Sequence, residues 1–330
     1  MYPNLSLFRF YLAFCVVIFH FYRDIAPQAG TLAVFLFFMI SGFLIVKLLE
    51  ETYKERYREF ITNRFLRLYP TYLFALLCGY IIIKAFPVES LHINPVMSLP
   101  RDLNIILDNI FIFDLYGQPQ RVVPVAWSLN TELNFYILFL VLSFFSIKLR
   151  KFVLFGLMLF PFLFVRKDLV FYGHFFGSAI AFSLGALYYY YKDKIRINVI
   201  VQYFLVISIP IIMFIVPILF NFSGARIIDI GWINHIIILF VLFFSFEFFL
   251  KKSNNIQYSK VSEFLGMLSY PLFLLHWVAS VITYKFFEID RNSLEHLLIG
   301  GGIALILSVL AYLLIEKPLS YKRKRIREMC

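Results

Sequence analysis

Two ionisable residues, Arg9 and His20, stand in an otherwise apolar stretch near the N-terminus. They are 11 residues apart, close to three turns of an α-helix, so both side chains project from one helix face. An imidazole takes up and releases a proton near neutral pH, and a guanidinium binds phosphate or carboxylate groups. The pair predicts a chemical site along this face. The alternative is that each side chain reaches for a different edge of a membrane.

A second basic pair, Arg64 and Arg67, lies in the segment RFLRLYP just before Pro70. Residues three apart share a helix face, so the two guanidiniums are placed to clamp phosphate groups together. The alternative is that they fix the orientation of the chain or bind anionic lipid headgroups.

The segment AWSLNTELNFY carries Trp127 and, at four-residue intervals on one helix face, Ser128, Glu132 and Tyr136. A carboxylate in an apolar helix is costly and calls for a role. Glu132 either holds a histidine in its productive tautomer or favours the positive end of its own helix dipole.

The segment LGMLSYPLFLLHW carries Tyr270 and His276 on either side of Pro271. Proline removes a backbone donor, so these polar side chains either line a cavity or satisfy the interrupted helix. Two other histidines, His174 and His235, have no comparable polar neighbours and are interpreted as structural.

Two further segments bear on packing rather than on chemistry. In FLFFMISGFLI, the small residues Ser41 and Gly42 let a neighbouring helix backbone come close. The long joint from Val88 to Pro124 contains NIILDNIFIF, whose apolar spacing suits a helix that lies in or dips into the membrane interface.

The elements that position these residues follow from composition. Hydrophobic residues make up 61% of the 330-residue chain and charged residues only 15%, with a mean hydropathy of +0.81. In soluble domains, apolar residues average about 45–50% and charged residues about 25%. Apolar stretches long enough to cross a bilayer recur along the chain. The sequence predicts an all-α integral membrane protein, a single bundle of about ten transmembrane helices near residues 5–22, 31–49, 70–86, 125–147, 152–165, 169–191, 199–220, 232–250, 264–287 and 294–315.

The net charge of +11 is accounted for by membrane topology and does not require a nucleic-acid partner. If the N-terminus is cytoplasmic, inner joints hold 21 of the 31 lysines and arginines and outer joints hold 9, with Arg9 inside the first span. This asymmetry agrees with the positive-inside rule. Ten spans place both termini in the cytoplasm. The three cysteines form no disulfide framework, and no metal site is predicted.

Taken together, these segments resemble the acyltransferase 3 family of bacterial membrane acyltransferases. The resemblance rests on Arg9 and His20, FFMISGFLI, RFLRLYP, AWSLNTELNFY, HFFGSAIAFSLGAL, LGMLSYPLFLLHW and the closing EKP at Glu316–Pro318, in family order over nearly the whole chain. The expected organisation is a membrane domain over residues 1–320 and a basic cytoplasmic tail over 321–330, without an appended hydrolase-like domain.

The resemblance implies transfer of an acetyl or other acyl group from cytoplasmic acyl-CoA to a hydroxyl of an envelope glycan such as O-antigen, capsule or peptidoglycan, at the bacterial inner membrane. Acetyl-CoA is then a donor substrate, and no permanently bound cofactor is expected. By position, His20 becomes the catalytic base or acyl carrier and Glu132 its orienting partner. The remaining residues divide into donor-binding Arg9, Arg64 and Arg67 and pocket-lining Trp127, Ser128, Tyr136, Tyr270 and His276.

A transporter or flippase for a lipid-linked glycan is the rival interpretation, because it too would place His, Arg and Glu inside a helical bundle. Only the enzyme adds acyl mass to a glycan at the expense of acyl-CoA. No internal repeat of the kind found in many secondary transporters is evident in the sequence.

Overall fold

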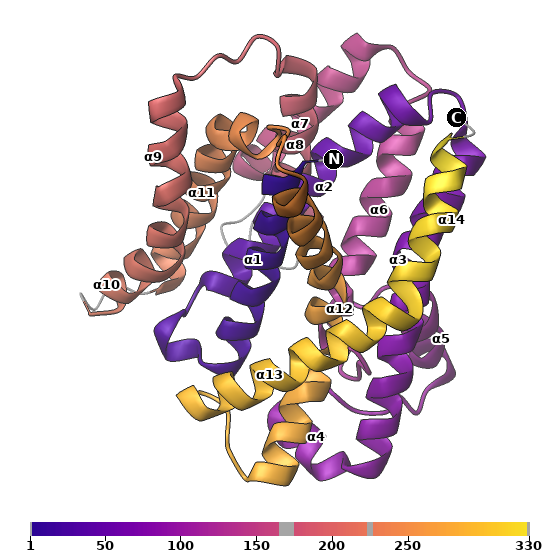
Figure 1. Ribbon diagram of the computed structural model, residues 1–330, viewed down its shortest axis with the longest axis vertical. Coiled ribbons are helices and arrows are strands. Elements are labelled where there is room, and N and C mark those ends of the chain that lie inside the picture. Colours follow the sequence, from indigo (N-terminus) through magenta and orange to yellow (C-terminus); the bar gives the residue numbers. More distant parts are fainter. Residues whose placement is uncertain (1, 165–174, 223–226, 329–330) are drawn as a thin grey trace.

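The computed structural model describes residues 2–164, 175–222 and 227–328, and within these ranges the regular structure is helical, with no strand (Figure 1). The α-helices, in chain order, are α1 (Pro3–Phe21), α2 (Ala29–Lys47), α3 (Tyr57–Ala85), α4 (Pro87–Ile93), α5 (Leu103–Phe111), α6 (Trp127–Leu142), α7 (Ile147–Phe164), α8 (Phe175–Tyr191), α9 (Val199–Pro210), α10 (Val216–Phe222), α11 (Ile227–Phe249), α12 (Ile256–Phe287), α13 (Leu294–Ala311) and α14 (Lys317–Glu328). Short π-helical turns join α9 to α10 and α13 to α14.

The predicted all-α membrane fold is confirmed. Among the described residues, seven helical stretches are long and apolar enough to cross a membrane: Pro3–Phe21, Ala29–Thr52, Tyr57–Ala85, Pro124–Leu142, Val199–Leu219, Ile256–Phe287 and Leu294–Glu328. The other three predicted spans coincide with α7, α8 and α11. The chain between α7 and α8, which includes His174 and the ends of two predicted spans, lies outside the described residues.

Two helices extend further than predicted. Helix α3 begins at Tyr57 rather than at Pro70, and α12 begins at Ile256 rather than at Phe264, and both continue through an internal proline. Long basic and polar side chains in the added turns reach past the apolar core while the backbone stays helical. As a result Arg64 and Arg67, predicted to share a helix face just before the span, belong to the same continuous helix as the span itself.

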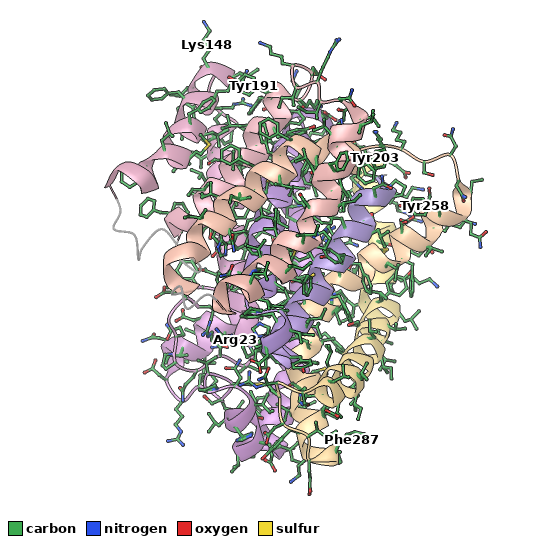
Figure 2. The ribbon with its side chains drawn as sticks, turned by 90° about the vertical axis from the view of Figure 1, so that its left-hand side faces the viewer. Arg23, Lys148, Tyr191, Tyr203, Tyr258 and Phe287 are labelled. Carbon is green, nitrogen blue, oxygen red and sulfur yellow. The ribbon has the colours of Figure 1, made fainter. Side chains whose placement is uncertain are left out.

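The joints are divided between the two ends of the bundle as the charge pattern predicts. Figure 2 shows Lys148, Tyr191 and Tyr258 toward one end and Arg23 and Phe287 toward the other. The N-terminal end of α1 and the C-terminal end of α14 both lie toward the first of these ends (Figure 1). Which side of the membrane that end faces remains a prediction.

Helices α2 and α8 pack with almost no space between their backbones. A Cβ added to Gly42 would lie 2.1 Å from the carbonyl oxygen of Phe182, and one added to Gly185 would lie 1.9 Å from that of Met39. Only glycine fits at such distances, so the prediction that Gly42 admits a neighbouring backbone is confirmed. This contact fixes α2 as a central element of the bundle.

The segment between α4 and α6 packs against the middle of α3. The Tyr69 hydroxyl donates to the carbonyl oxygen of Phe111 at 2.6 Å, and Tyr72 donates to that of Asn109. The Asn109 side chain is buried and its carbonyl accepts from the backbone N–H of Val122. Helix α5 therefore lies against α3 with most of its large apolar side chains exposed, and it leads the chain into α6.

Candidate functional site

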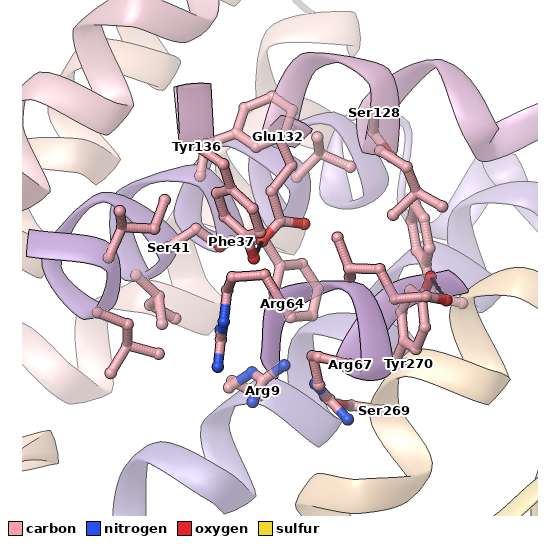
Figure 3. Close-up of a pocket in the computed structure, with 18 residues that line it drawn as sticks. Arg9, Phe37, Ser41, Arg64, Arg67, Ser128, Glu132, Tyr136, Ser269 and Tyr270 are labelled. Atoms are coloured by element: carbon pink, nitrogen blue, oxygen red, sulfur yellow. Dashed lines mark hydrogen bonds between the residues drawn. The ribbon is translucent and has the colours of Figure 1, made fainter. Parts of the chain in front are cut away.

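Helices α1, α2, α3, α6 and α12 surround a cavity with an empty volume of about 830 Å³ (Figure 3). We call it the arginine pocket. Its polar lining consists of Arg9, Ser41, Arg64, Arg67, Ser128, Glu132, Tyr136, Ser269 and Tyr270, and its apolar lining includes Phe37 and Phe273. The structure thus brings together residues from five helices that lie as far apart in the sequence as Arg9 and Phe273.

Three cations from two helices share this pocket, and their guanidiniums gather on the same side of it (Figure 3). Arg64 donates to Asn63 at 3.2 Å and lies 6.0 Å from the ring centroid of Tyr136. Within the described residues, Arg9 takes part in no hydrogen bond or ion pair, although the charges of Arg67 and Glu132 act on it. Like charges held together in a medium of low dielectric constant repel strongly, so the pocket is suited to an anionic ligand.

The third cation, Arg67, is held by a buried carboxylate that the sequence analysis did not assign to the site. Glu316 is only 1% exposed and accepts hydrogen bonds from Arg67 at 2.9 Å, Arg323 at 3.0 Å and Thr71 at 2.8 Å. Such a buried network is stabilising only while every charge is compensated. Glu316, just before α14, therefore links that helix to α3. Its carboxylate partly compensates the positive charge of Arg67, whereas Arg9 has no such ion-pair partner among the described residues.

The tail beyond residue 320 is part of this network rather than a separate segment. Residues 321–328 of this tail belong to α14, and the backbone carbonyl of Arg323 accepts from the Asn63 side chain of α3 at 3.0 Å. The expected boundary at residue 320 falls inside this helix.

Glu132 is positioned by two hydroxyl groups. Ser41 donates to its Oε1 at 3.0 Å and Tyr136, one turn further along α6, donates to the same oxygen at 2.7 Å. Ser41 was predicted to serve packing, but it faces the pocket and binds this carboxylate. Two donors on one oxygen fix the rotamer of Glu132 beside the arginines.

The other predicted pocket residues divide between two places. Ser128 and Tyr270 line the arginine pocket; Ser128 donates to the Val125 carbonyl at 2.9 Å and Tyr270 to that of Leu68 at 3.0 Å. Trp127 packs edge-to-face against Phe38, which lines the pocket. His276 lies elsewhere, against His20.

His20 faces a second cavity at the opposite end of α1, with an empty volume of about 1260 Å³. We call it the histidine pocket. Its lining includes His20, Arg23, Asp24, His92, Trp277, Asp290 and Arg291. The His20 ring is surrounded by aromatic rings, with centroids at 4.9 Å for Phe19, 4.6 Å for Trp277 and 5.1 Å for His276.

The tautomer of His276 follows from its backbone contact. Its Nδ1 lies 2.8 Å from the Phe273 carbonyl oxygen, which can only accept, so Nδ1 carries the proton. Nε2 is then an acceptor, and it is buried with no hydrogen-bond partner among the described residues. The indole Nε1 of Trp277, a donor, is also buried with no hydrogen-bond partner among the described residues. Two buried polar atoms without a hydrogen-bond partner among the described residues therefore lie beside His20.

Glu132 and His20 line different pockets, so the structure does not bring together the pair that was expected to act together. The carboxylate accepts from Ser41 and Tyr136, whereas the neighbours of His20 are aromatic. The residue that the structure places beside His20 is His276.

A series of aromatic ring contacts runs along α12 from the arginine pocket to the neighbours of His20. Phe37 and Phe273 line the arginine pocket with ring centroids 6.4 Å apart, and Phe273 lies 6.4 Å from His276. On α1, Arg9 and His20 are separated by about 16 Å at 1.5 Å per residue. The two pockets are therefore neighbours connected by the same two helices.

Four residues were not assigned to a site from the sequence: Arg23, Trp277 and Arg291, which line the histidine pocket, and Glu316, which binds Arg67. Glu316 and Trp277 stood in segments already singled out, the closing EKP and LLHW, and that was the available signal. His235, interpreted as structural, packs edge-to-face on Phe35.

Comparison with known proteins agrees with the geometry. Residues 2–313 match the family described as "Acyltransferase domain". The chain is also 37% identical over 124 residues to "Protein 2 in picA locus" of Rhizobium radiobacter, a match that covers 32% of this chain and 63% of that protein. No solved structure matches. Because the family match extends over nearly the whole sequence and the described residues form a bundle of long apolar helices, this chain is a multi-pass membrane protein that belongs to the acyltransferase 3 family.

Proposed function

We propose that this acyltransferase moves an acetyl group from cytoplasmic acetyl-CoA to a hydroxyl of a cell-envelope glycan. The observation that carries the proposal is the arrangement of two pockets on one helix, with Arg9 lining one and His20 lining the other. A cationic pocket suits the phosphates of a coenzyme, and an imidazole in a cavity at the opposite end suits a transfer step.

The arginine pocket is the proposed donor site. Arg9 and Arg64 hold charge that no carboxylate neutralises within hydrogen-bond distance among the described residues, and Arg67 adds a partly compensated third cation. CoA carries its phosphates at one end and its thioester at the end of a thin, extended pantetheine arm. With the phosphates at the arginines, that arm has to cross about 16 Å to bring the thioester to His20.

His20 is the proposed catalytic residue. In direct transfer, the acceptor hydroxyl gives its proton to the imidazole as its oxygen attacks the thioester carbonyl carbon, the carbon–sulfur bond breaks, and CoA leaves as a thiolate that takes up a proton. In the covalent alternative, an imidazole nitrogen attacks the carbonyl carbon first, the carbon–sulfur bond breaks, and CoA leaves as a thiolate that takes up a proton. The acceptor hydroxyl then attacks the acyl-imidazole, the acyl carbon–nitrogen bond breaks, and the freed ring nitrogen takes up the proton of the hydroxyl. His276 and Trp277 are placed to orient the ring or the acceptor in either route.

Purified protein in nanodiscs, incubated with radiolabelled acetyl-CoA and an envelope-glycan extract, tests the proposal. The wild-type protein should release CoA and label the glycan, and His20→Ala should lose about 10²–10⁴-fold in rate while still binding CoA. Incubation without acceptor separates the routes, since trapped label on His20 supports the covalent one.

His235→Asn is the matched control, because His235 is also a histidine inside a helix but lies against Phe35 instead of in either pocket. It should transfer acetyl normally. Wild-type transfer by folded His20→Ala protein, or glycan movement without consumption of acetyl-CoA, would contradict the proposal.

A further inference from the structure

Two arginines flank His20 in the histidine pocket, each held above one of its aromatic neighbours. The guanidinium carbon of Arg23 lies 5.4 Å from the ring centroid of Phe19, and that of Arg291 lies 5.4 Å from the ring centroid of Trp277. Phe19 and Trp277 themselves contact the His20 ring. Both positive charges therefore line the same cavity as His20.

The carboxylates that share this pocket are engaged elsewhere. Asp24 accepts from the Asn292 side chain at 2.7 Å, and its backbone N–H donates to the same side chain at 3.0 Å. Asp290 lies 2.6 Å from Nε2 of His92. Among the described residues, neither Arg23 nor Arg291 forms an ion pair within 4.0 Å.

The two guanidiniums also act on each other. Burial lowers the pKa of Arg291 below its usual value and the charge of Arg23 lowers it further, whereas Asp290 raises it. Arg291 lies in the loop between α12 and α13, and Arg23 lies after α1, so the chain places two repelling cations at one pocket from remote positions. An anion between them would remove that repulsion.

We infer that the acceptor carries an anionic group, a carboxylate or a phosphate, and that Arg23 and Arg291 bind this group so that a neighbouring hydroxyl lies at His20. The inference rests on the proposed function and adds the chemical class of the acceptor to it. A uronic-acid sugar and the diphosphate of a lipid-linked glycan both supply such a group.

Calorimetric binding to the full-length protein in nanodiscs tests this inference without requiring transfer. The probes are methyl glucuronide, its neutral counterpart methyl glucoside, and farnesyl diphosphate, which has the lipid diphosphate but no sugar. At least one anionic probe should bind more tightly than methyl glucoside. Arg23→Gln and Arg291→Gln should each weaken that binding about ten- to hundredfold, as expected for a lost charge-assisted hydrogen bond.

Arg101→Gln is the matched control, because it removes one arginine from the same predicted side of the membrane outside the pocket. It should leave probe binding unchanged. Tight binding of methyl glucuronide identifies a uronic acid as the anionic group, and tight binding of farnesyl diphosphate identifies the lipid carrier. The inference is overturned if no anionic probe binds better than methyl glucoside, or if Arg101→Gln weakens binding as much as the pocket variants.

Binding of CoA by each variant separates this inference from the proposed function. Loss of anionic-probe binding with CoA binding intact affects only the acceptor site. If wild-type protein binds the anionic probes but not CoA, the proposed donor is wrong while the acceptor inference stands.

Discussion

The imidazole rings of His20 and His276 stack at a centroid distance of 5.1 Å, with 13° between their planes. They come from α1 and α12, and the backbone contact of His276 leaves its Nε2 as a buried acceptor beside the proposed catalytic ring. We propose that His276 is a positioning residue for His20.

Replacing His276 by Phe keeps an aromatic ring against His20 but removes the imidazole nitrogens. We expect kcat for acetyl transfer to fall by about tenfold or more, the equivalent of one lost interaction of about 1.4 kcal/mol. The KM for acetyl-CoA should not change, because His276 does not line the arginine pocket. Steady-state kinetics of the His276→Phe protein measures both values. An unchanged kcat would make the contact one of packing alone.

Replacing Glu132 by Gln keeps an oxygen that accepts from Ser41 and Tyr136 and removes a negative charge from the arginine pocket. Acetyl-CoA should bind more tightly, with KM lower by about fivefold, since one partly screened charge opposite the donor phosphates is worth about 1 kcal/mol. The pH profile of kcat should stay as in the wild type. A displaced profile would instead indicate that Glu132 acts on His20.

Arg64 and Arg67 should respond differently to substitution by alanine. Arg64→Ala should raise the KM for acetyl-CoA about tenfold or more with little change in kcat, because contacts to remote phosphates contribute uniform binding. Arg67→Ala should also lower the thermal unfolding midpoint, because it takes one partner from buried Glu316.

Arg58→Ala, an exposed arginine on the same helix, is the control for both variants and should leave both measurements unchanged. Equal donor affinity in wild-type and Arg64→Ala protein would assign Arg64 to lipid contact or topology.

Replacing Gly185 by Ala should destabilise the fold by about 3 kcal/mol or more, at the upper end for overpacking, because the added Cβ would meet the backbone carbonyl of Met39 at 1.9 Å. A backbone atom has no alternative rotamer, so α2 and α8 must move apart. Gly301→Ala is the control, since nothing lies within 4 Å of its added Cβ. Thermal unfolding in detergent compares the two. Similar midpoints for both variants would contradict close packing of α2 on α8.

Single cysteines at Asn94 and Asn254, in a background without Cys15, Cys78 and Cys330, test orientation. The positive-inside distribution predicts that an impermeant thiol reagent added to intact cells labels position 94 and not position 254. The reverse pattern of labelling would invert the bundle and exchange the proposed donor and acceptor sides.

The sequence by itself determined that the protein lies in a membrane, that its fold is all-α and roughly where its helices lie. The length of each apolar stretch and the number of basic residues in each loop are local properties that a bilayer constrains directly. It also identified Arg9, Arg64, Glu132 and Tyr136, because an ionisable or polar group inside an apolar helix is costly wherever it stands. Each of these side chains lines one pocket.

Only the tertiary structure decided which of these groups meet. The partners of Arg67, His20 and Glu132 are Glu316, His276 and Ser41, all on other helices. Such contacts depend on the rotation and depth at which helices pack, and these are set by close approaches such as that between Gly42 and the Phe182 carbonyl. Helical periodicity places a side chain on a face, and the packing of the bundle decides what that face touches.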